Sequence, residues 1–288
     1  MDQLPQAILD GLVLSSIYAI VALGLTLIFG VLQVVNFSHG QLVTLAAYVA
    51  FALVNAQVNF WLALVIVLVA MSALGVFMEW ATFRPVQSVP INGLIVSIGW
   101  IAIFTALISV IWGPNQYSMN GIFSGSITTP TISISQNHVF VVVCGLVVMA
   151  AISLTLRFTP IGKAIRATAQ NREAAALVGI RVRRISSVAF GLSAALAGLG
   201  GILLANLFPV SPGLGQSYMV YAFIALVIGG AGSAVGAVLG SVVIGMVIAF
   251  AQTYGSITVV STLPFVVLIV VLFLRPRGLI RTDIEASL

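Results

Sequence analysis

Long apolar stretches with almost no charge are the feature that most constrains this chain. Charged residues make up only 6% of its 288 positions and hydrophobic residues 61%, whereas roughly a quarter of a soluble domain is charged. A helix needs about 20 apolar residues to cross a hydrocarbon core of roughly 30 Å, and such stretches follow one another nearly from end to end. We therefore expect an all-α, polytopic membrane helical bundle with about eight or nine transmembrane spans.

Nine candidate spans follow from the hydropathy, all within a single transmembrane domain that occupies residues 1–288. The seventh is short and ends at a run of glycines, so it is expected either to cross the membrane fully or to form a broken or re-entrant helix. The expected spans are residues 11–34, 40–55, 60–80, 92–112, 138–157, 185–207, 217–230, 233–252 and 262–274.

The basic residues divide between the two membrane faces in one consistent way. Cytoplasmic loops close to span ends are enriched in lysine and arginine. If the loop 158–184 is cytoplasmic, alternation of nine spans places all eleven basic residues, as late as Arg281, on that side. The pattern predicts a multi-pass chain with a cytoplasmic C-terminus and an N-terminus, with the acidic Asp2, outside. Because the basic residues stand between apolar spans, no nucleic-acid partner is expected.

The loop 158–184 is the only sizeable polar stretch of the chain. Thr159 can cap a helix, Pro160 fits a first helical position, and Gly179 can adopt the left-handed conformation that ends a helix. We expect one or two short helices across the membrane surface here. An electrostatic anchor would explain the basic charge alone, but the many alanines and glycines favour a helix that seats in a groove of another protein.

A second polar group follows the first span. Polar side chains at membrane depth are costly unless they are partnered, so these residues are candidates for a translocation pathway or gate. The alternative is a tight turn in which Asn36 or Ser38 bonds free backbone amides at the start of the second helix. No metal site is expected, because His39 has no second histidine or carboxylate nearby in sequence. The group consists of Asn36, Ser38, His39 and Gln41.

The sequence contains three smaller patterns: regularly spaced glycines, a charged pair and a repeated motif. Small residues at Gly232, Gly236 and Gly240 recur every fourth position and predict close helix packing, although glycine is generally common in membrane helices. Glu79 and Arg84 are expected to form an interfacial anchor pair or to contact the loop 158–184, with Pro85 stopping the third helix. One internal echo pairs Tyr18-Ala19-x-x-Ala22-Leu23 with Tyr221-Ala222-x-x-Ala225-Leu226, for which chance is the alternative.

The run Glu173-Ala174-Ala175-x-x-x-Gly179 resembles the EAA signature of ABC-importer permeases, without that signature's distal Ile-x-Leu-Pro. Together with further motifs, nearly the whole chain resembles the LivH-type branched-chain amino acid permease family. These motifs are Tyr18-Ala19 with Ala22-Leu23-Gly24, Val35-Asn36-Phe37-Ser38-His39-Gly40 with serine where alanine is usual, Phe83-Arg84-Pro85-Val86, Gly162-Lys163-Ala164-Ile165-Arg166-Ala167, Leu177-x-Gly179-Ile180, and Gly229-Gly230-x-Gly232-Ser233-x-x-Gly236-Ala237.

The resemblance implies a permease subunit of the bacterial inner membrane that moves branched-chain or related small amino acids inward by alternating access. It implies a related permease subunit as partner, in a heterodimer or homodimer, together with two cytoplasmic ATPases and a periplasmic or extracellular solute-binding protein. The loop 158–184 would dock into an ATPase as a coupling helix. The expected coupling residues are Gly162, Lys163, Ala164, Arg166, Ala167, Asn171, Glu173, Ala174, Ala175, Leu177 and Gly179.

No catalytic residue or resident cofactor is expected in this chain. The sequence has no G-x-x-x-x-G-K-[ST] phosphate loop, so ATP and Mg²⁺ are expected to be bound by the partner ATPases. Urea or short amides are alternative cargoes within the same transporter class. An ion-coupled secondary transporter is the rival class, but it would place ionisable side chains within its spans, and here Asp10 and Glu79 come only near span ends.

Overall fold

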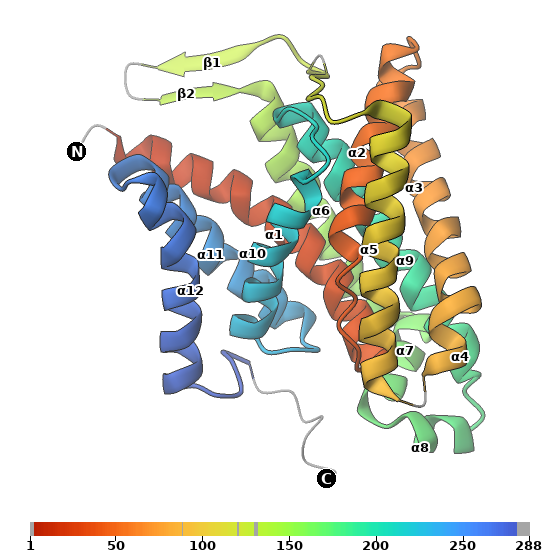
Figure 1. The fold of residues 1–288 in the computed structure, drawn as a ribbon. Coiled ribbons are helices and arrows are strands. Elements are labelled where there is room, and N and C mark those ends of the chain that lie inside the picture. Colours follow the sequence, from red (N-terminus) through yellow and green to blue (C-terminus); the bar gives the residue numbers. More distant parts are fainter. Residues whose placement is uncertain (1–2, 88, 120, 130–131, 281–288) are drawn as a thin grey trace.

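A computed structural model describes residues 3–87, 89–119, 121–129 and 132–280. Asp2 and Arg281 lie outside these described residues. The chain forms a bundle of helices with one β-hairpin at its edge (Figure 1). The elements are α1 Leu4–Leu32, α2 His39–Asn55, α3 Phe60–Met78, the π-helix η1 Glu79–Phe83, α4 Arg84–Val86, α5 Pro90–Trp112, β1 Ser126–Thr129, β2 Ile132–Ser135, α6 Gln136–Phe158, α7 Pro160–Gln170, α8 Arg172–Leu177, α9 Val182–Leu207, α10 Leu214–Gly229, α11 Ala234–Tyr254 and α12 Ile257–Leu274.

Within the described part of the chain, 7 helices are long and apolar enough to cross a membrane: α1, α3 continued through α4, α5, α6, α9, α11 and α12. The other two expected spans correspond to α2 and α10, which have 17 and 16 residues. Both are shorter than the roughly 20 residues that a straight crossing needs. The helical membrane bundle agrees with the sequence analysis, and the exact number of eight or nine spans stays a prediction.

The helices differ sharply in how deeply they are buried. In the most apolar part of α1 89% of the residues are buried, and in α9 83%, whereas α6 and α12 reach only 11% and 6%. The outer helices present large aliphatic side chains that suit lipid. Since lipid is as apolar as leucine, hydrophobicity alone does not separate central from outer helices. The molecule is therefore organised around α1 and α9.

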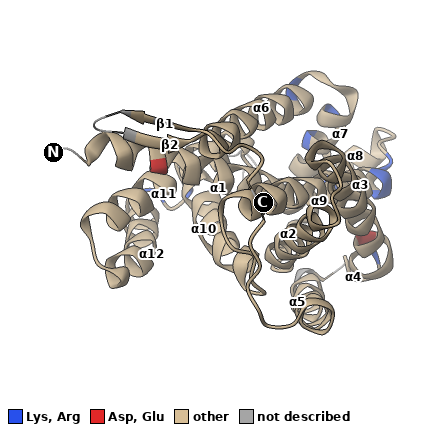
Figure 2. Cartoon of the chain, turned by 90° about the horizontal axis from the view of Figure 1, so that it is seen from above, with Lys and Arg blue, Asp and Glu red and all other residues tan. Residues whose placement is uncertain are grey.

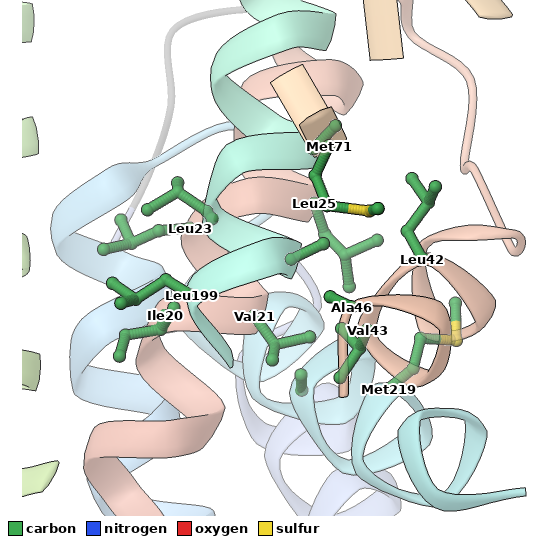
Figure 3. Packing of buried hydrophobic residues seen from close by; sticks show 14 of the residues in the cluster. Ile20, Val21, Leu23, Leu25, Leu42, Val43, Ala46, Met71, Leu199 and Met219 are labelled. Atoms are coloured by element: carbon green, nitrogen blue, oxygen red, sulfur yellow. The ribbon is translucent and has the colours of Figure 1, made fainter. Parts of the chain in front are cut away.

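Aliphatic side chains from several helices meet in one continuous core (Figure 3). Close approach to α9 is possible because Gly201 has no side chain: a Cβ there would overlap the carbonyl oxygen of Val43 in α2. Backbones that approach this closely gain van der Waals contact that lipid cannot offer. The residues labelled in Figure 3 are Ile20, Val21, Leu23, Leu25, Leu42, Val43, Ala46, Met71, Leu199 and Met219.

The glycine pattern of residues 232–240 is only partly helical. A Cβ at Gly236 or Gly240 would overlap the backbone carbonyl of Gly229 or Ala225 in α10, so both residues lie where α10 and α11 touch. Gly232 differs from the expectation, because it precedes α11 and has a φ of 90°. The side chain of Ser233 caps the helix by accepting the Gly236 N–H, which leaves Gly232 in the turn before it.

Two further local features depart from the sequence expectations. Within the loop 113–137, β1 and β2 form an antiparallel hairpin with Ser126 opposite Ser135. Pro85 does not stop the third helix, since the chain continues through η1 into α4. The Arg84 N–H bonds the carbonyl of Glu79, five residues back, and the helix ends at Val86, one residue after Pro85.

The described basic residues belong to elements at one end of the bundle. In Figure 1, α4, α7, α8 and the last turn of α12 lie at the bottom, and β1 and β2 at the top. Figure 2 shows most of the lysine and arginine colour around α4, α7 and α8, away from the start of α1. This arrangement is typical of the positive-inside pattern, and the assignment of that end to the cytoplasm stays a prediction.

Candidate functional site

The polar loop folds into two short helices, α7 and α8, as the sequence analysis expected. The Thr159 hydroxyl accepts the Gly162 N–H at 3.0 Å and begins α7. Asn171 caps α8 in the same way, with its side-chain oxygen 2.9 Å from the Ala174 N. Gly179 ends the segment at a φ of 87°, a conformation that glycine adopts without strain. The helix signals at Thr159 and Gly179 are thus confirmed.

The residues expected to couple to an ATPase divide into a buried and an exposed set. Gly162 and Ala175 are buried, and a Cβ at Gly162 would overlap the Thr155 carbonyl oxygen at the end of α6. These two positions therefore seat the helices on the bundle. Ala164 and Ala167 are half-buried. The exposed members are Lys163, Arg166, Asn171, Glu173, Ala174, Leu177 and Gly179.

The C-terminal end of α8 carries an apolar tip, Leu177 and Val178, which we call the docking tip. Their side chains are 89% and 78% exposed, although the loop around them is polar. Val178 was not among the residues expected from the sequence, and its position beside Leu177 was the available signal. Large apolar side chains this exposed in a polar segment are typical of a surface that another protein covers.

A polar cluster joins α8 to the end of the third span. The Glu79 side chain is fully buried and accepts hydrogen bonds from Arg84 at 3.2 and 2.7 Å, and from Ser187 of α9 at 2.7 Å. Gln87 donates to the same carboxylate at 3.3 Å and accepts from Arg172 of α8. We call these five residues the coupling cluster. It connects α8, α4, η1 and α9 in one chain of contacts.

The coupling cluster borders a groove of about 510 Å³ between α4 and α8. Burial lowers the pKa of the Arg172 guanidinium, and the charge of Glu79 acts in the opposite direction. The pairing of Glu79 with Arg84 agrees with one of the two readings of the sequence, and the link through Gln87 supplies the contact with the loop. Sequence reasoning missed Gln87 and Ser187 as contacts, because neither is charged. The groove is lined by Arg84, Gln87, Arg172, Glu173, Ala176, Val182 and Arg183.

The polar group after the first span lies in the interior, between α1, α2, α9 and α10, and we call it the polar junction. Asn36, Ser38, His39 and Gln41 are at most 4% exposed. The Asn36 side-chain oxygen accepts the Ser38 N–H at 3.1 Å and the Ser38 hydroxyl at 2.6 Å. The expected tight turn is therefore present, with Asn36 rather than Ser38 bonding the amide. The His39 ring lies 3.4 Å from the Ser193 hydroxyl of α9.

Several polar atoms of the polar junction lack partners among the described residues. They are the Asn36 amide nitrogen, the His39 Nε2 and the Gln41 side-chain oxygen, and the side-chain oxygen of the neighbouring Gln216 is in the same situation. Gln216 of α10 lies against Gly40, where an added Cβ would be 2.8 Å from its side-chain oxygen. A buried polar group without a hydrogen bond costs about 1–3 kcal/mol, so water or a polar solute is the natural partner for these atoms.

Comparison with known proteins identifies relatives along nearly the whole chain. The profile of a family described as branched-chain amino acid transport system / permease component matches residues 7–272. The high-affinity branched-chain amino acid transport system permease protein LivH of Escherichia coli K12 is 29% identical, over 97% of this chain and 96% of the relative.

Two other relatives agree with this match. BraD, a permease protein of the same description from Pseudomonas aeruginosa, is 29% identical over 97% of both chains. A probable branched-chain amino acid transport permease protein LivH of Methanocaldococcus jannaschii is 26% identical over 96% of this chain and 92% of the relative. No solved structure gives a significant match.

Proposed function

The chain belongs to the family of permease components of branched-chain amino acid transport systems, and on this premise we propose that its cargo is a branched-chain or related small amino acid. The chain is a permease subunit of an ABC importer rather than an enzyme. We place it in the bacterial inner membrane with the N-terminus outside and the C-terminus in the cytoplasm. The gathering of basic residues around α4, α7 and α8 supports this orientation.

The docking tip is the observation that carries the proposed mechanism. Its two exposed apolar side chains offer a small hydrophobic knob on a polar helix pair, which suits a groove in an ATPase subunit. Two ATPases, a related permease and an external solute-binding protein complete the proposed assembly. Closure of the ATPase pair on ATP would push α7 and α8 against the bundle.

The coupling cluster gives that push a path into the membrane. Arg172 moves with α8, and its contact with Gln87 leads to the buried Glu79, which also bonds Ser187 of α9. Because α9 is among the most buried helices, its displacement changes the packing at the centre of the bundle. Charge-assisted hydrogen bonds are strong enough to move their partners together.

We assign the gate of the translocation pathway to the polar junction. Its unpartnered amide atoms lie between α1, α2, α9 and α10, and a displacement of α9 would repack α1 and α2, which contact it directly. In the closed state water would satisfy these atoms, and in transit the polar groups of the cargo would do so. The turn at Asn36 holds the start of α2 in place while this exchange occurs.

Uptake measurements on membrane vesicles test the proposal. Labelled leucine should accumulate in response to ATP and persist when a protonophore abolishes ion gradients. Collapse of uptake by the protonophore while ATP is still present would instead identify an ion-coupled carrier. Labelled urea and short amides in competition would show whether they are the cargo.

A matched pair of variants tests the docking tip itself. Leu177→Ser should abolish both uptake and co-purification of the ATPase subunits, while membrane insertion is unchanged because the side chain packs against almost nothing. Ile257→Ser is the control, since Ile257 is 90% exposed at the start of α12, away from the tip. Full co-purification with Leu177→Ser would refute the docking role.

A further inference from the structure

A second cavity lies on the side of the molecule away from α4, α7 and α8. It measures about 310 Å³ and is bordered by the ends of α1, α6 and α9 and by α10, α11 and α12. Neither the proposed gate nor the coupling cluster contributes to it. Its lining residues are Asp10, Val13, Leu14, Tyr18, His138, Phe208, Ser217, Tyr218, Tyr221, Ile248, Gln252 and Val260.

Four aromatic rings form one wall of this cavity, which we call the tyrosine pocket. The Tyr18 ring lies 5.8 Å from the rings of both Tyr218 and Tyr221. Phe208 extends the wall, with its ring 5.9 Å from that of Tyr218. Such a wall offers a cation the negative faces of several rings at once.

The two similar sequence motifs that begin at Tyr18 and Tyr221 come together at this wall. Tyr18 and Tyr221 hold the same place in the two repeated motifs, and their rings are in contact across α1 and α10. The alanines that follow them, Ala22 and Ala225, are both fully buried. Each motif therefore buries its small residues in the bundle and presents its tyrosine to the same cavity.

The polar groups of the tyrosine pocket are incompletely satisfied. The Asp10 carboxylate accepts one hydrogen bond, from Gln6 at 3.0 Å, and has no ion-pair partner among the described residues. The other two described acidic residues, Glu79 and Glu173, belong to the opposite end of the bundle. The buried Nδ1 of His138 has no hydrogen-bond partner in the part of the chain that the structure describes. The pocket thus combines a carboxylate that has no ion-pair partner among the described residues, an aromatic wall and aliphatic side chains.

We propose that the tyrosine pocket binds a zwitterionic aliphatic amino acid on its way to the polar junction. The α-ammonium group would lie at Asp10 and against the tyrosine faces, and the aliphatic chain against Val13, Leu14 and Ile248. The His138 ring can donate a hydrogen bond to the carboxylate through its Nδ1, which is unpartnered among the described residues. This inference rests on the proposed function, because it names where that function's cargo is recognised.

The ethanolamine headgroup of a membrane lipid shares part of this chemistry, as a primary ammonium joined to an apolar body. The arrangement of the pocket favours the amino acid, because aliphatic side chains, the Asp10 carboxylate and the His138 ring line the same cavity of about 310 Å³. The test below separates the two sources by the composition of the bilayer.

Protection of an introduced thiol against alkylation tests the pocket directly. Cys144 is the only native cysteine, so a Cys144→Ala background leaves one reactive site. In that background the full chain carrying Ser217→Cys is labelled with a water-soluble maleimide in phosphatidylcholine nanodiscs. Leucine should cause a saturable loss of labelling. Tyr254→Cys is the control, because Tyr254 is 59% exposed on α11 and does not line the pocket.

Two comparisons give the proposal its specificity. Adding Asp10→Asn should raise the half-protecting concentration of leucine about tenfold, because a charge-assisted hydrogen bond is lost. Isocaproate has the same aliphatic chain as leucine without the ammonium group. It should therefore protect the chain with Asp10 no better than it protects the Asp10→Asn variant.

Three outcomes would overturn the inference. If leucine leaves the labelling of Ser217→Cys unchanged while cells with this double variant, Cys144→Ala with Ser217→Cys, still take up leucine, the pocket is refuted and the proposed function stands. Equal protection by isocaproate would refute the ammonium contact. Protection that appears only when phosphatidylethanolamine is added would identify a lipid site. Absence of leucine uptake in cells with the wild-type chain would instead refute the proposed function, since the labelling assay measures binding without transport.

Discussion

The coupling cluster and the polar junction both contain buried polar side chains, yet they differ in how their hydrogen bonds are met. In the coupling cluster the Glu79 carboxylate receives hydrogen bonds from three side chains. In the polar junction the side-chain oxygen of Gln41 and the amide nitrogen of Asn36 have no partner among the described residues. A cluster whose hydrogen bonds are all made holds its helices together, whereas one with unpaired polar atoms can bind water or a solute. The first is suited to transmitting force and the second to admitting a solute.

The largest effect is expected where the satisfied cluster is broken at its centre. Glu79→Ala leaves Arg84 and Ser187 without their shared acceptor and should lower the free energy of unfolding by about 3 kcal/mol. Removing one partner of a buried ion pair costs about 3–5 kcal/mol, and Arg84 is 31% exposed, which favours the lower end. Thermal unfolding of the purified chain in detergent measures this loss. Glu173→Ala, at an exposed position, should leave the unfolding temperature unchanged.

The next effect separates the seat of α8 from its docking tip. Ala175 is 3% exposed, so Ala175→Leu forces extra methyl groups into a packed site and should cost about 2 kcal/mol. Leu177→Ser, two residues later, should leave unfolding unchanged and remove ATPase co-purification. If Ala175→Leu has the same free energy of unfolding as the wild type, Ala175 is not tightly packed. α8 would then be held less rigidly than the hydrogen bonds of the coupling cluster indicate.

A smaller loss of stability should accompany a complete loss of coupling when the link between α8 and α4 is cut. Arg172→Ala removes the contact with Gln87 and should cost about 1 kcal/mol of unfolding free energy. ATPase subunits should still co-purify, and ATP hydrolysis should continue without leucine uptake. Arg181→Ala, a neighbouring exposed position, serves as the control. Normal uptake with Arg172→Ala would show that force reaches α9 by another path.

The smallest change in stability is expected at the polar junction. Gln41→Leu removes a buried oxygen that has no hydrogen-bond partner within the described ranges, so the free energy of unfolding should stay equal or rise by up to about 1 kcal/mol. Leucine uptake should fall nevertheless, because the polar partner for the solute or its water is gone. A strong loss of stability would contradict the comparison, since it would show that Gln41 is already satisfied in the folded chain.

Much of the architecture could be predicted because its signals are local. Apolar length marks the helices, and the caps of α7 follow from Thr159 and Pro160. Burial could not be predicted, since the exposed α12 is even more apolar than the buried α1 and only packing places α1 inside. Arg172 and Gln87 lie 85 residues apart in sequence, and no pattern along the chain links them. The prediction that Gly232 lies on the same helical face as Gly236 and Gly240 was wrong, because Ser233 caps α11 and Gly232 precedes that cap.

The π-helical turn at Glu79–Phe83 has a consequence for how the third span meets its neighbours. A π turn holds one residue more than an α-helical turn would at the same place, and one residue corresponds to about 100° of rotation around an α-helix. The side chains that follow are therefore rotated relative to those that precede, and Arg84 can fold back onto the carboxylate of Glu79. Shortening this turn by a single residue would aim the guanidinium elsewhere, so the length of the segment, and not only its composition, is under structural constraint.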